Sequence, residues 1–158
     1  SEITPERTPA LAAAAAVTLD RRGTGGCGWS YGWKMGLRAR LYDGEKSLDQ
    51  LRALLTKSSL PNLFSLCGRA LQVDGNLGAS AAIAEMLIQS HGGVIQLLPA
   101  LPDAWSNGKV TGLRARGGYA VDIEWRDGKV TNYRIAGKKQ QPVRVRVNGE
   151  LTTVTAEK

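Results

Sequence analysis

The sequence has few of the side chains that hold metal ions or build disulfide frameworks. Its 158 residues include a single histidine, His91, and only two cysteines, Cys27 and Cys67. A metal site needs several His, Cys or carboxylate ligands close together, so we expect no metal and no cofactor. Two cysteines do not make a disulfide framework, and we expect both to be small buried side chains that fill the core.

Long hydrophobic runs and export signals are also missing. The longest apolar run, residues 10–17, is mostly alanine and too short to span a bilayer, so no membrane partner is expected. The start at Ser1 lacks a basic segment followed by a leucine-rich core, which predicts no signal peptide in this chain. The missing initiator methionine is typical of a processed chain or a fragment.

Positive charge is concentrated in the second half. Of the net charge of +7, residues 91–158 contribute 11 basic and 6 acidic side chains. Such an excess is one way to bind nucleic acid or another polyanion. The candidate contacts are Arg114, Arg116, Arg144 and Arg146. Because these arginines alternate with strand positions and few aromatic side chains lie among them to stack on bases, we expect a solvated sheet face and no nucleic-acid partner.

The first part of the chain has the periodicity of helices. Thr8-Pro9 and Gly23 are typical start and stop signals around an alanine-rich helix. Apolar residues then recur every four positions from Trp29 to Leu41, and two more apolar clusters indicate further helices. These clusters are Leu48, Leu51, Leu54 and Leu55, and Ile83, Ala84, Leu87 and Ile88. The last helix is expected to stop near Gly92-Gly93.

After Gly93 the period changes to that of strands. Apolar and polar side chains alternate over 119–125 and 143–147, and Asp127-Gly128 predicts a hairpin turn into a return strand. The sequence therefore predicts an α+β fold. A helical segment, 1–93, precedes a small antiparallel β-sandwich-like domain, 94–158, with one solvated face.

The most informative stretch is residues 71–87, in which Asp74 precedes Gly75 and Asn76 at the start of an apolar helix. Unpaired N–H groups and partial positive charge at a helix N-terminus suit an anion or a sugar hydroxyl. We therefore expect Asp74 to take part in chemistry. From these local features alone, a role as a helix cap or turn residue is an open alternative.

Three blocks of sequence occur along the chain. Residues 26–34 and 40–45 are similar to T-G-W-S-x-A-W-K and A-R-L-x-D-G, and residues 71–87 are similar to F-Q-I-D-G-N-F-G-G-T-A-G-I-A-E-M-L. Residues 95–118 are similar to a segment that leaves a catalytic domain. Together, and in this order, the blocks resemble glycoside hydrolase family 95, the inverting α-L-fucosidases.

The resemblance implies that residues 1–93 are the closing helices of an (α/α)6 catalytic barrel and that residues 94–158 are the β domain after it. The partners would be the upstream barrel of the same enzyme and a fucosylated glycan. The chain alone would be inactive and would expose apolar surface where the rest of the barrel packs. The parent enzyme is expected to be secreted or periplasmic. Leu71 and Leu77 replace aromatic residues of the signature, which leaves fucose and L-galactose both open as the sugar.

Inverting glycosidases combine an acid with a base that activates water on the far face of the sugar. By resemblance, the acid Glu and two water-positioning asparagines lie upstream of this chain, and Asp74 polarises the asparagine amides. A carboxylate that accepts an amide N–H raises electron density on the amide oxygen, so this role needs only an ionised and oriented Asp. Trp29 is the candidate for binding the sugar face, whereas Trp33 is expected in the core. Gln72 and Asn76 either bind sugar hydroxyls or brace the turn.

Three other polar residues are expected to be structural. Glu85 would pair with a helix end or an arginine, Asp43 would end a helix, and His91 would lie at a helix C-terminus. The alternative function is a non-catalytic carbohydrate-binding or accessory module with coplanar aromatic side chains on its surface. The candidates for such a platform, Tyr119, Trp125 and Tyr133, fall largely on apolar strand faces, which favours the core.

Overall fold

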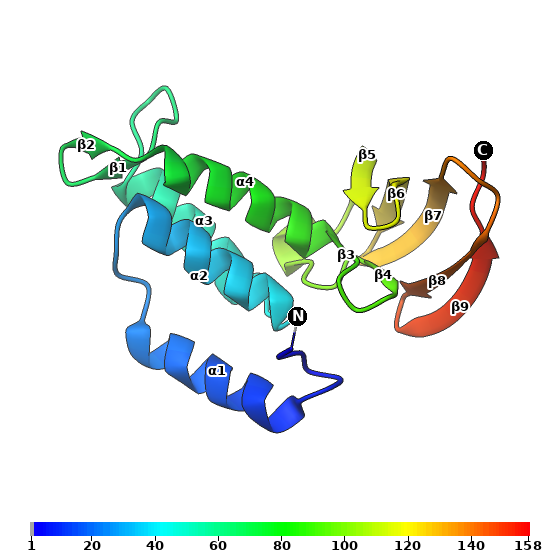
Figure 1. Ribbon diagram of the computed structural model, residues 1–158. Helices are drawn as coiled ribbons and strands as arrows, with labels where there is room; N and C mark the ends of the chain where they lie inside the picture. The colour runs from blue at the N-terminus through cyan, green and yellow to red at the C-terminus, as the bar shows by residue number, and fades with distance from the viewer. Residues whose placement is uncertain (1) are drawn as a thin grey trace.

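The computed structural model describes residues 2–158, in which a group of helices is followed by two packed sheets (Figure 1). The helices are α1 (Pro9–Arg22), α2 (Gly28–Arg40), α3 (Gly44–Lys57) and α4 (Val73–Leu87), with a short 3₁₀ helix, η1 (Asp103–Trp105). The strands are β1 (Leu66–Cys67), β2 (Ala70–Leu71), β3 (Ile88–Gln89), β4 (Ile95–Leu97), β5 (Gly108–Ala115), β6 (Tyr119–Arg126), β7 (Lys129–Ala136), β8 (Pro142–Val147) and β9 (Glu150–Thr155). The predicted α+β fold class is confirmed. No helix among these residues is long and apolar enough to cross a membrane.

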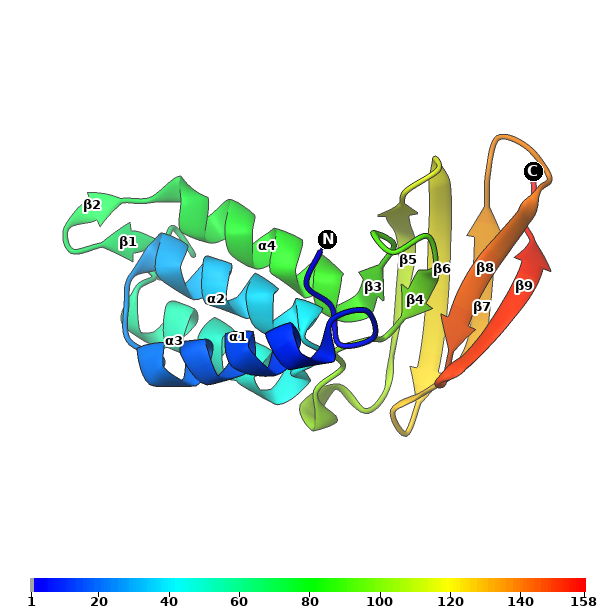
Figure 2. The ribbon, with the colours of Figure 1, turned by 60° about the horizontal axis from the view of Figure 1, so that its bottom comes forward.

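The helical segment is built around the close packing of α2 and α4, which run in the same direction (Figures 1 and 2). A Cβ atom added to Gly75 would lie 2.7 Å from the Gly28 backbone, and one added to Gly32 would lie 3.0 Å from Ala79 N. Glycine is needed at these positions because the two backbones approach too closely for a side chain. α3 returns alongside α2. Helix α1 begins at Pro9 and is followed by Gly23, as the sequence predicts.

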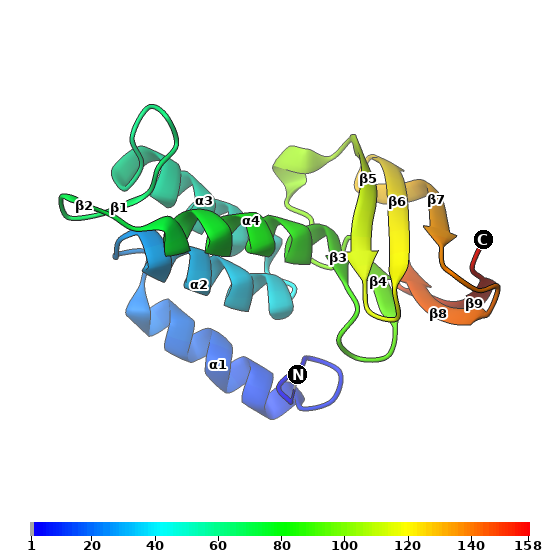
Figure 3. The ribbon, with the colours of Figure 1, turned by 45° about the horizontal axis from the view of Figure 1, so that its top comes forward.

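The last helix ends earlier than predicted. α4 ends at Leu87 and not near Gly92-Gly93, because Ile88 and Gln89 form strand β3 and pair with β4. His91 therefore follows a strand, and its predicted position at a helix C-terminus is wrong. Strands β3 and β4 lie between α4 and strands β5 to β9, so they join the two parts of the molecule (Figure 3).

The β module contains a three-stranded sheet, β5-β6-β7, and a four-stranded sheet, β3-β4-β8-β9. Asp127 and Gly128 both have positive φ at the predicted hairpin between β6 and β7, and Asn148-Gly149 turns the chain between β8 and β9. One pairing departs from the expected antiparallel pattern. β4 pairs with β8 in parallel, with Ile95 opposite Val145, so the four-stranded sheet is mixed.

The side chains between the two sheets form a closed core. Val121, Ile123 and Val145 are completely buried there. Tyr119 and Trp125 belong to the same core, and Tyr133 packs against it. The predicted core positions of these aromatic residues are confirmed, and they provide no flat aromatic platform for a carbohydrate.

Candidate active site

The N-terminal ends of α2 and α4 lie side by side, because the two helices are parallel and touch through glycine at their first turns. Each helix N-terminus carries partial positive charge and N–H groups without partners inside the helix. Two such ends next to each other favour anionic or hydroxyl groups in front of them. The sequence places a tryptophan in the first turn of α2 and a carboxylate in the first turn of α4.

Asp74 is exposed in the first turn of α4. The helix begins at Val73, so Asp74 lies inside the helix and the N-cap position is occupied by Gln72. The structure provides no cap hydrogen bond from a side chain at this end, which excludes the alternative role of Asp74 as the helix cap. Among residues 2–158 the carboxylate has no hydrogen bond or ion pair, so it is available to a group outside this chain.

Trp29 lies in the first turn of α2 and is 48% exposed. Its ring packs against α4, because a Cβ atom on Gly78 would lie 3.4 Å from Trp29 Cζ3. The indole is thus held in place on one side and open on the other. Trp33, one turn later, is half-buried and packs against the guanidinium of Arg22, 5.4 Å from the ring centroid, so it is less buried than expected for a core residue.

Gln72 and Asn76 hold the first turns and the preceding loop together. Gln72 Oε1 accepts a 2.8 Å hydrogen bond from the backbone N–H of Trp29. Asn76 Oδ1 accepts from Ser65 N at 2.9 Å, and Asn76 Nδ2 donates to Leu63 O at 2.7 Å. Of the two roles that the sequence leaves open, these bonds support bracing.

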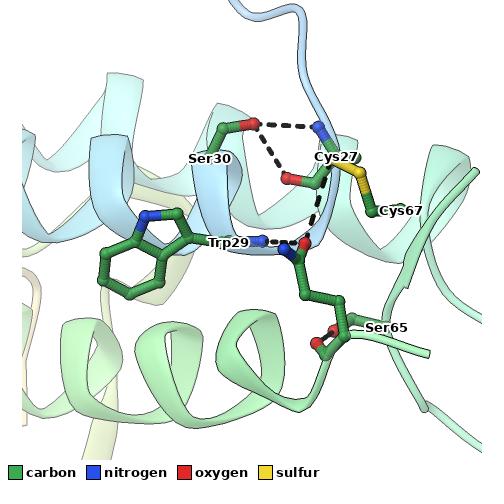
Figure 4. The surroundings of a disulfide bond; sticks show 6 residues. Cys27, Trp29, Ser30, Ser65 and Cys67 are labelled. Carbon is green, nitrogen blue, oxygen red and sulfur yellow. Dashed lines mark hydrogen bonds between the residues drawn. A yellow bond between two sulfur atoms is a disulfide. The ribbon is translucent and has the colours of Figure 1, made fainter. Parts of the chain in front are cut away.

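Cys27 and Cys67 form a disulfide, so the prediction that both are simple core-filling residues is wrong (Figure 4). The bond connects the N-cap of α2 to strand β1, across 40 residues of sequence. Ser30 also caps this end of the helix, since the backbone N–H of Cys27 donates a 2.8 Å hydrogen bond to Ser30 Oγ (Figure 4). The hairpin β1–β2, which leads directly into Gln72, is therefore tied covalently to α2.

The other carboxylates considered from the sequence are already paired. Glu85 accepts from Arg40 Nη2 at 2.9 Å, as expected for an arginine partner. Asp43 accepts from Arg38 Nη1 at 3.2 Å and caps α3 through Lys46 N at 3.1 Å. Asp43 is structural as predicted, although it begins a helix where the sequence suggested that it ends one. Neither residue forms a pair of acid and base with Asp74.

Sequence reasoning missed the disulfide, and it left the role of the two amides open between bracing and sugar binding. Both features depend on contacts between segments that are far apart in the chain. The only sequence signal for these contacts is the glycines beside Trp29 and Asp74. Glycines spaced along two helices permit the helix backbones to touch. This signal indicates close packing without identifying the partner helix.

Two family models match the chain in succession. The glycosyl hydrolase family 95 catalytic domain matches residues 1–87, and the glycoside hydrolase family 95 C-terminal domain matches residues 89–158. Alpha-L-fucosidase 2 of Arabidopsis thaliana is 43% identical over 142 residues, which are 83% of this chain and 17% of that protein. Proteins named probable alpha-fucosidase A are similar as well. The one from Aspergillus oryzae is 33% identical over 127 residues (68% of this chain, 18% of that protein), and the one from Aspergillus niger is 32% identical over 132 residues (73% and 17%). The chain spans about a sixth of the length of these relatives.

Proposed function

The chain belongs to glycoside hydrolase family 95, and from this membership we propose that it completes the active site of an inverting α-L-fucosidase by contributing Asp74. The observation that carries the proposal is the exposed carboxylate in the first turn of α4, next to the N-terminus of α2 and without a partner among residues 2–158. The relatives named alpha-L-fucosidase 2 and alpha-fucosidase A support the choice of terminal α-L-fucosyl linkages as the substrate.

In the proposed mechanism, Asp74 accepts a hydrogen bond from the asparagine amides that hold the attacking water. The accepted N–H increases electron density on the amide oxygen, which then takes a proton from water as it attacks the sugar. A separate acid protonates the leaving oxygen on the opposite face. The acid and the asparagines come from the upstream part of the enzyme. Asp74 suits this role because it is exposed, lies on a rigid helix and is not paired with any residue of 2–158.

Trp29 is the proposed sugar-binding residue, since its ring is fixed on Gly78 and exposed on its other side. Gln72 Oε1 and the Asn76 amide act indirectly in this proposal, because they bond to the backbone. Their amides hold the backbone of α2 and the loop before β1 in place, and so keep Trp29 and Asp74 at a constant separation. Direct bonds from Gln72 Nε2 to sugar hydroxyls are a further part of the proposal.

The helical segment is proposed to be the closing part of an (α/α)6 barrel. Large apolar side chains are exposed on it, including Val73 and Leu77, as expected if further helices cover them. We expect the 158-residue chain to be inactive alone, because it lacks the acid and the water-binding amides. A secreted or periplasmic location of the enzyme fits the Cys27–Cys67 disulfide, since such bonds persist in oxidising compartments.

The test is Asp74→Asn in an enzyme that contains this chain together with the upstream domain. We expect hydrolysis of α-L-fucosides to fall by about 100-fold or more, with little change in the melting temperature. The matched control is Asp127→Asn, which also replaces an exposed carboxylate but lies at the β6–β7 turn, where Asn tolerates positive φ. Wild-type turnover in Asp74→Asn would remove Asp74 from the mechanism.

A further inference from the structure

A polar pocket lies where the helical segment meets the β module. It has a volume of about 110 Å³ and opens between the segment before α1, the end of α2 and strands β3, β4 and β8. We call it the junction pocket. Its polar lining includes Glu6, Tyr42, Gln89, His91 and Arg146. These residues are far from Asp74 in the fold, at the opposite ends of α2 and α4 (Figure 3).

Gln89 lines this pocket, is 3% exposed, and has an acceptor, Oε1, without a partner among residues 2–158. Its Nε2 donates to the backbone oxygens of Ala39 at 2.8 Å and Glu85 at 3.0 Å. Because both partners are acceptors, the amide cannot be turned around, and Oε1 is necessarily the atom left without a partner among residues 2–158. A buried carbonyl oxygen without a hydrogen bond is unfavourable, so a donor is needed beside it.

Two more buried atoms of the lining also lack partners within residues 2–158. They are His91 Nδ1 and Arg146 Nε. Arg146 is fixed by a 3.2 Å hydrogen bond from Nη1 to Gly149 O, which leaves Nε–H without an acceptor. Burial and the nearby charge of Arg40 lower the pKa of His91, so its ring is neutral at pH 7 and Nδ1 either accepts or donates.

The lining carries charges of both signs, since the carboxylate of Glu6 lines the pocket together with the guanidinium groups of Arg7 and Arg146. Glu6 Oε1 accepts from Tyr42 Oη at 2.6 Å and from Gln96 Nε2 at 3.4 Å, and Tyr42 stays protonated because its pKa is raised to about 12. A small anion would meet the Glu6 carboxylate and could not donate to Gln89 Oε1. A metal cation would meet the Arg146 guanidinium. The described part of the chain contains no cluster of three His, Cys, Asp or Glu residues for a metal.

We propose that the junction pocket binds a neutral molecule with hydroxyl groups, either a small polyol or a cluster of water molecules, that bridges Gln89 Oε1 and Arg146 Nε. A hydroxyl group both donates and accepts, so one molecule serves the unused acceptor and the unused donor together. The volume is sufficient for several water molecules, roughly 30 Å³ each, or for a three- or four-carbon polyol. The site links β3 to β8 and is independent of the proposed hydrolysis.

The experiment compares crystal structures of the protein grown without polyols and after soaking in glycerol or erythritol. Ordered waters within hydrogen-bonding distance of Gln89 Oε1 and Arg146 Nε in both crystals support the proposal and identify water as the occupant. Replacement of those waters by the polyol supports it and identifies the polyol. An empty pocket, a bound sulfate or metal ion, or a protein side chain from outside residues 2–158 in this position would overturn it.

A pair of variants tests the contacts themselves. Arg146→Met removes the donor, whereas the control Arg144→Met removes an exposed arginine two residues earlier on the same face of β8. In Arg146→Met we expect loss of the ordered density beside Gln89, and the dissociation constant of a bound polyol rises about 3- to 10-fold. Unchanged density in both variants, with the fold intact, would refute the assigned bridge.

Discussion

The helical segment and the β module bury their apolar side chains in different ways. In the β module, two sheets enclose large side chains such as Val121, Ile123 and Val145, all of which are completely buried. In the helical segment, the core consists largely of alanine and methionine packed between α2 and α4, while Trp29 and Leu77 are 48% and 68% exposed. One part is therefore closed on itself, and the other leaves several large apolar side chains exposed to solvent.

This difference indicates which contacts stabilise each part. The β module depends on its own core, so changes inside it should cost the same free energy in this chain and in a longer enzyme. The helical segment depends on short backbone contacts, a disulfide and, as we propose, additional helices outside residues 2–158. Substitutions of its exposed apolar side chains should therefore change the free energy of unfolding by an amount that depends on how much of the enzyme is present.

The largest expected effect is in the closed core. Ile123→Ala should lower the free energy of unfolding by about 2–5 kcal/mol, because it removes buried methylene groups and leaves a cavity. Leu77→Ala is the matched comparison at an exposed apolar side chain and should change it by less than about 0.5 kcal/mol in the 158-residue chain. Urea denaturation gives both values. The comparison fails if Leu77→Ala costs as much as Ile123→Ala in this chain, or if its cost does not increase in the full-length enzyme.

The next effect concerns a covalent link that lies within the helical segment alone. Replacing Cys27 and Cys67 by serine should cost about 2–4 kcal/mol, because a loop of 40 residues is no longer closed in the unfolded chain. Hydrogen exchange should show the loss in α2 and the β1–β2 hairpin, while protection in β6 and β7 is unchanged. Equal loss of protection in both parts would show that they unfold as one cooperative unit.

A smaller effect is expected from the contact between the helix N-termini. Gly75→Ala forces α4 away from the Gly28 backbone and should cost about 1–3 kcal/mol. In the enzyme it should also reduce turnover, since Asp74 and Trp29 move apart. Gly36→Ala is the control, because its added Cβ would lie 3.8 Å from Ala82 Cβ, an ordinary contact. This variant should be neutral or stabilising by about 0.4–1 kcal/mol, and comparable melting temperatures for the two variants would contradict the close-contact interpretation.

The smallest effect is the pH dependence at the junction of the two parts. Because the pKa of His91 is lowered in the folded chain, the unfolded chain binds the proton more readily. Stability is therefore full above the ordinary histidine value of 6.5 and decreases as pH falls from there toward the lowered pKa. Thermal denaturation between about pH 7.5 and pH 5 should show this decrease, and His91→Gln should abolish it, since His91 is the only histidine. A decrease that persists in His91→Gln would assign the effect to other groups.

Features that are set by neighbouring residues could be predicted from the sequence. Pro9 and Gly23 mark the ends of α1 correctly, and Asp127-Gly128 and Asn148-Gly149 mark two hairpins. These residues act through their own backbone conformational preferences, which do not depend on contacts with distant parts of the chain. The position of Asp74 at the start of an apolar helix was predictable for the same reason, whereas its catalytic role stays a prediction.

Features that depend on distant partners could not be predicted. Ile88 and Gln89 continue the helical pattern of α4, but pairing with β4 makes them a strand. The two cysteines are 40 residues apart, and their spacing gives no information about the 4.9 Å between their Cα atoms. The side-chain amides of Gln72 and Asn76 can form hydrogen bonds with solvent, sugar or backbone. Only the position of the loop before β1 shows that their partners are backbone groups.

The contact between Gly28 and Gly75 has a consequence for how such an active site could change during evolution. Because the two helices touch backbone to backbone, the separation of their first turns does not depend on the size of any side chain at that contact. Nearby positions such as Leu71 and Leu77 project away from it and are exposed. Under the proposed function, substitutions there alter the choice of sugar while the Asp74 carboxylate keeps its place, so specificity and catalytic geometry are free to diverge separately.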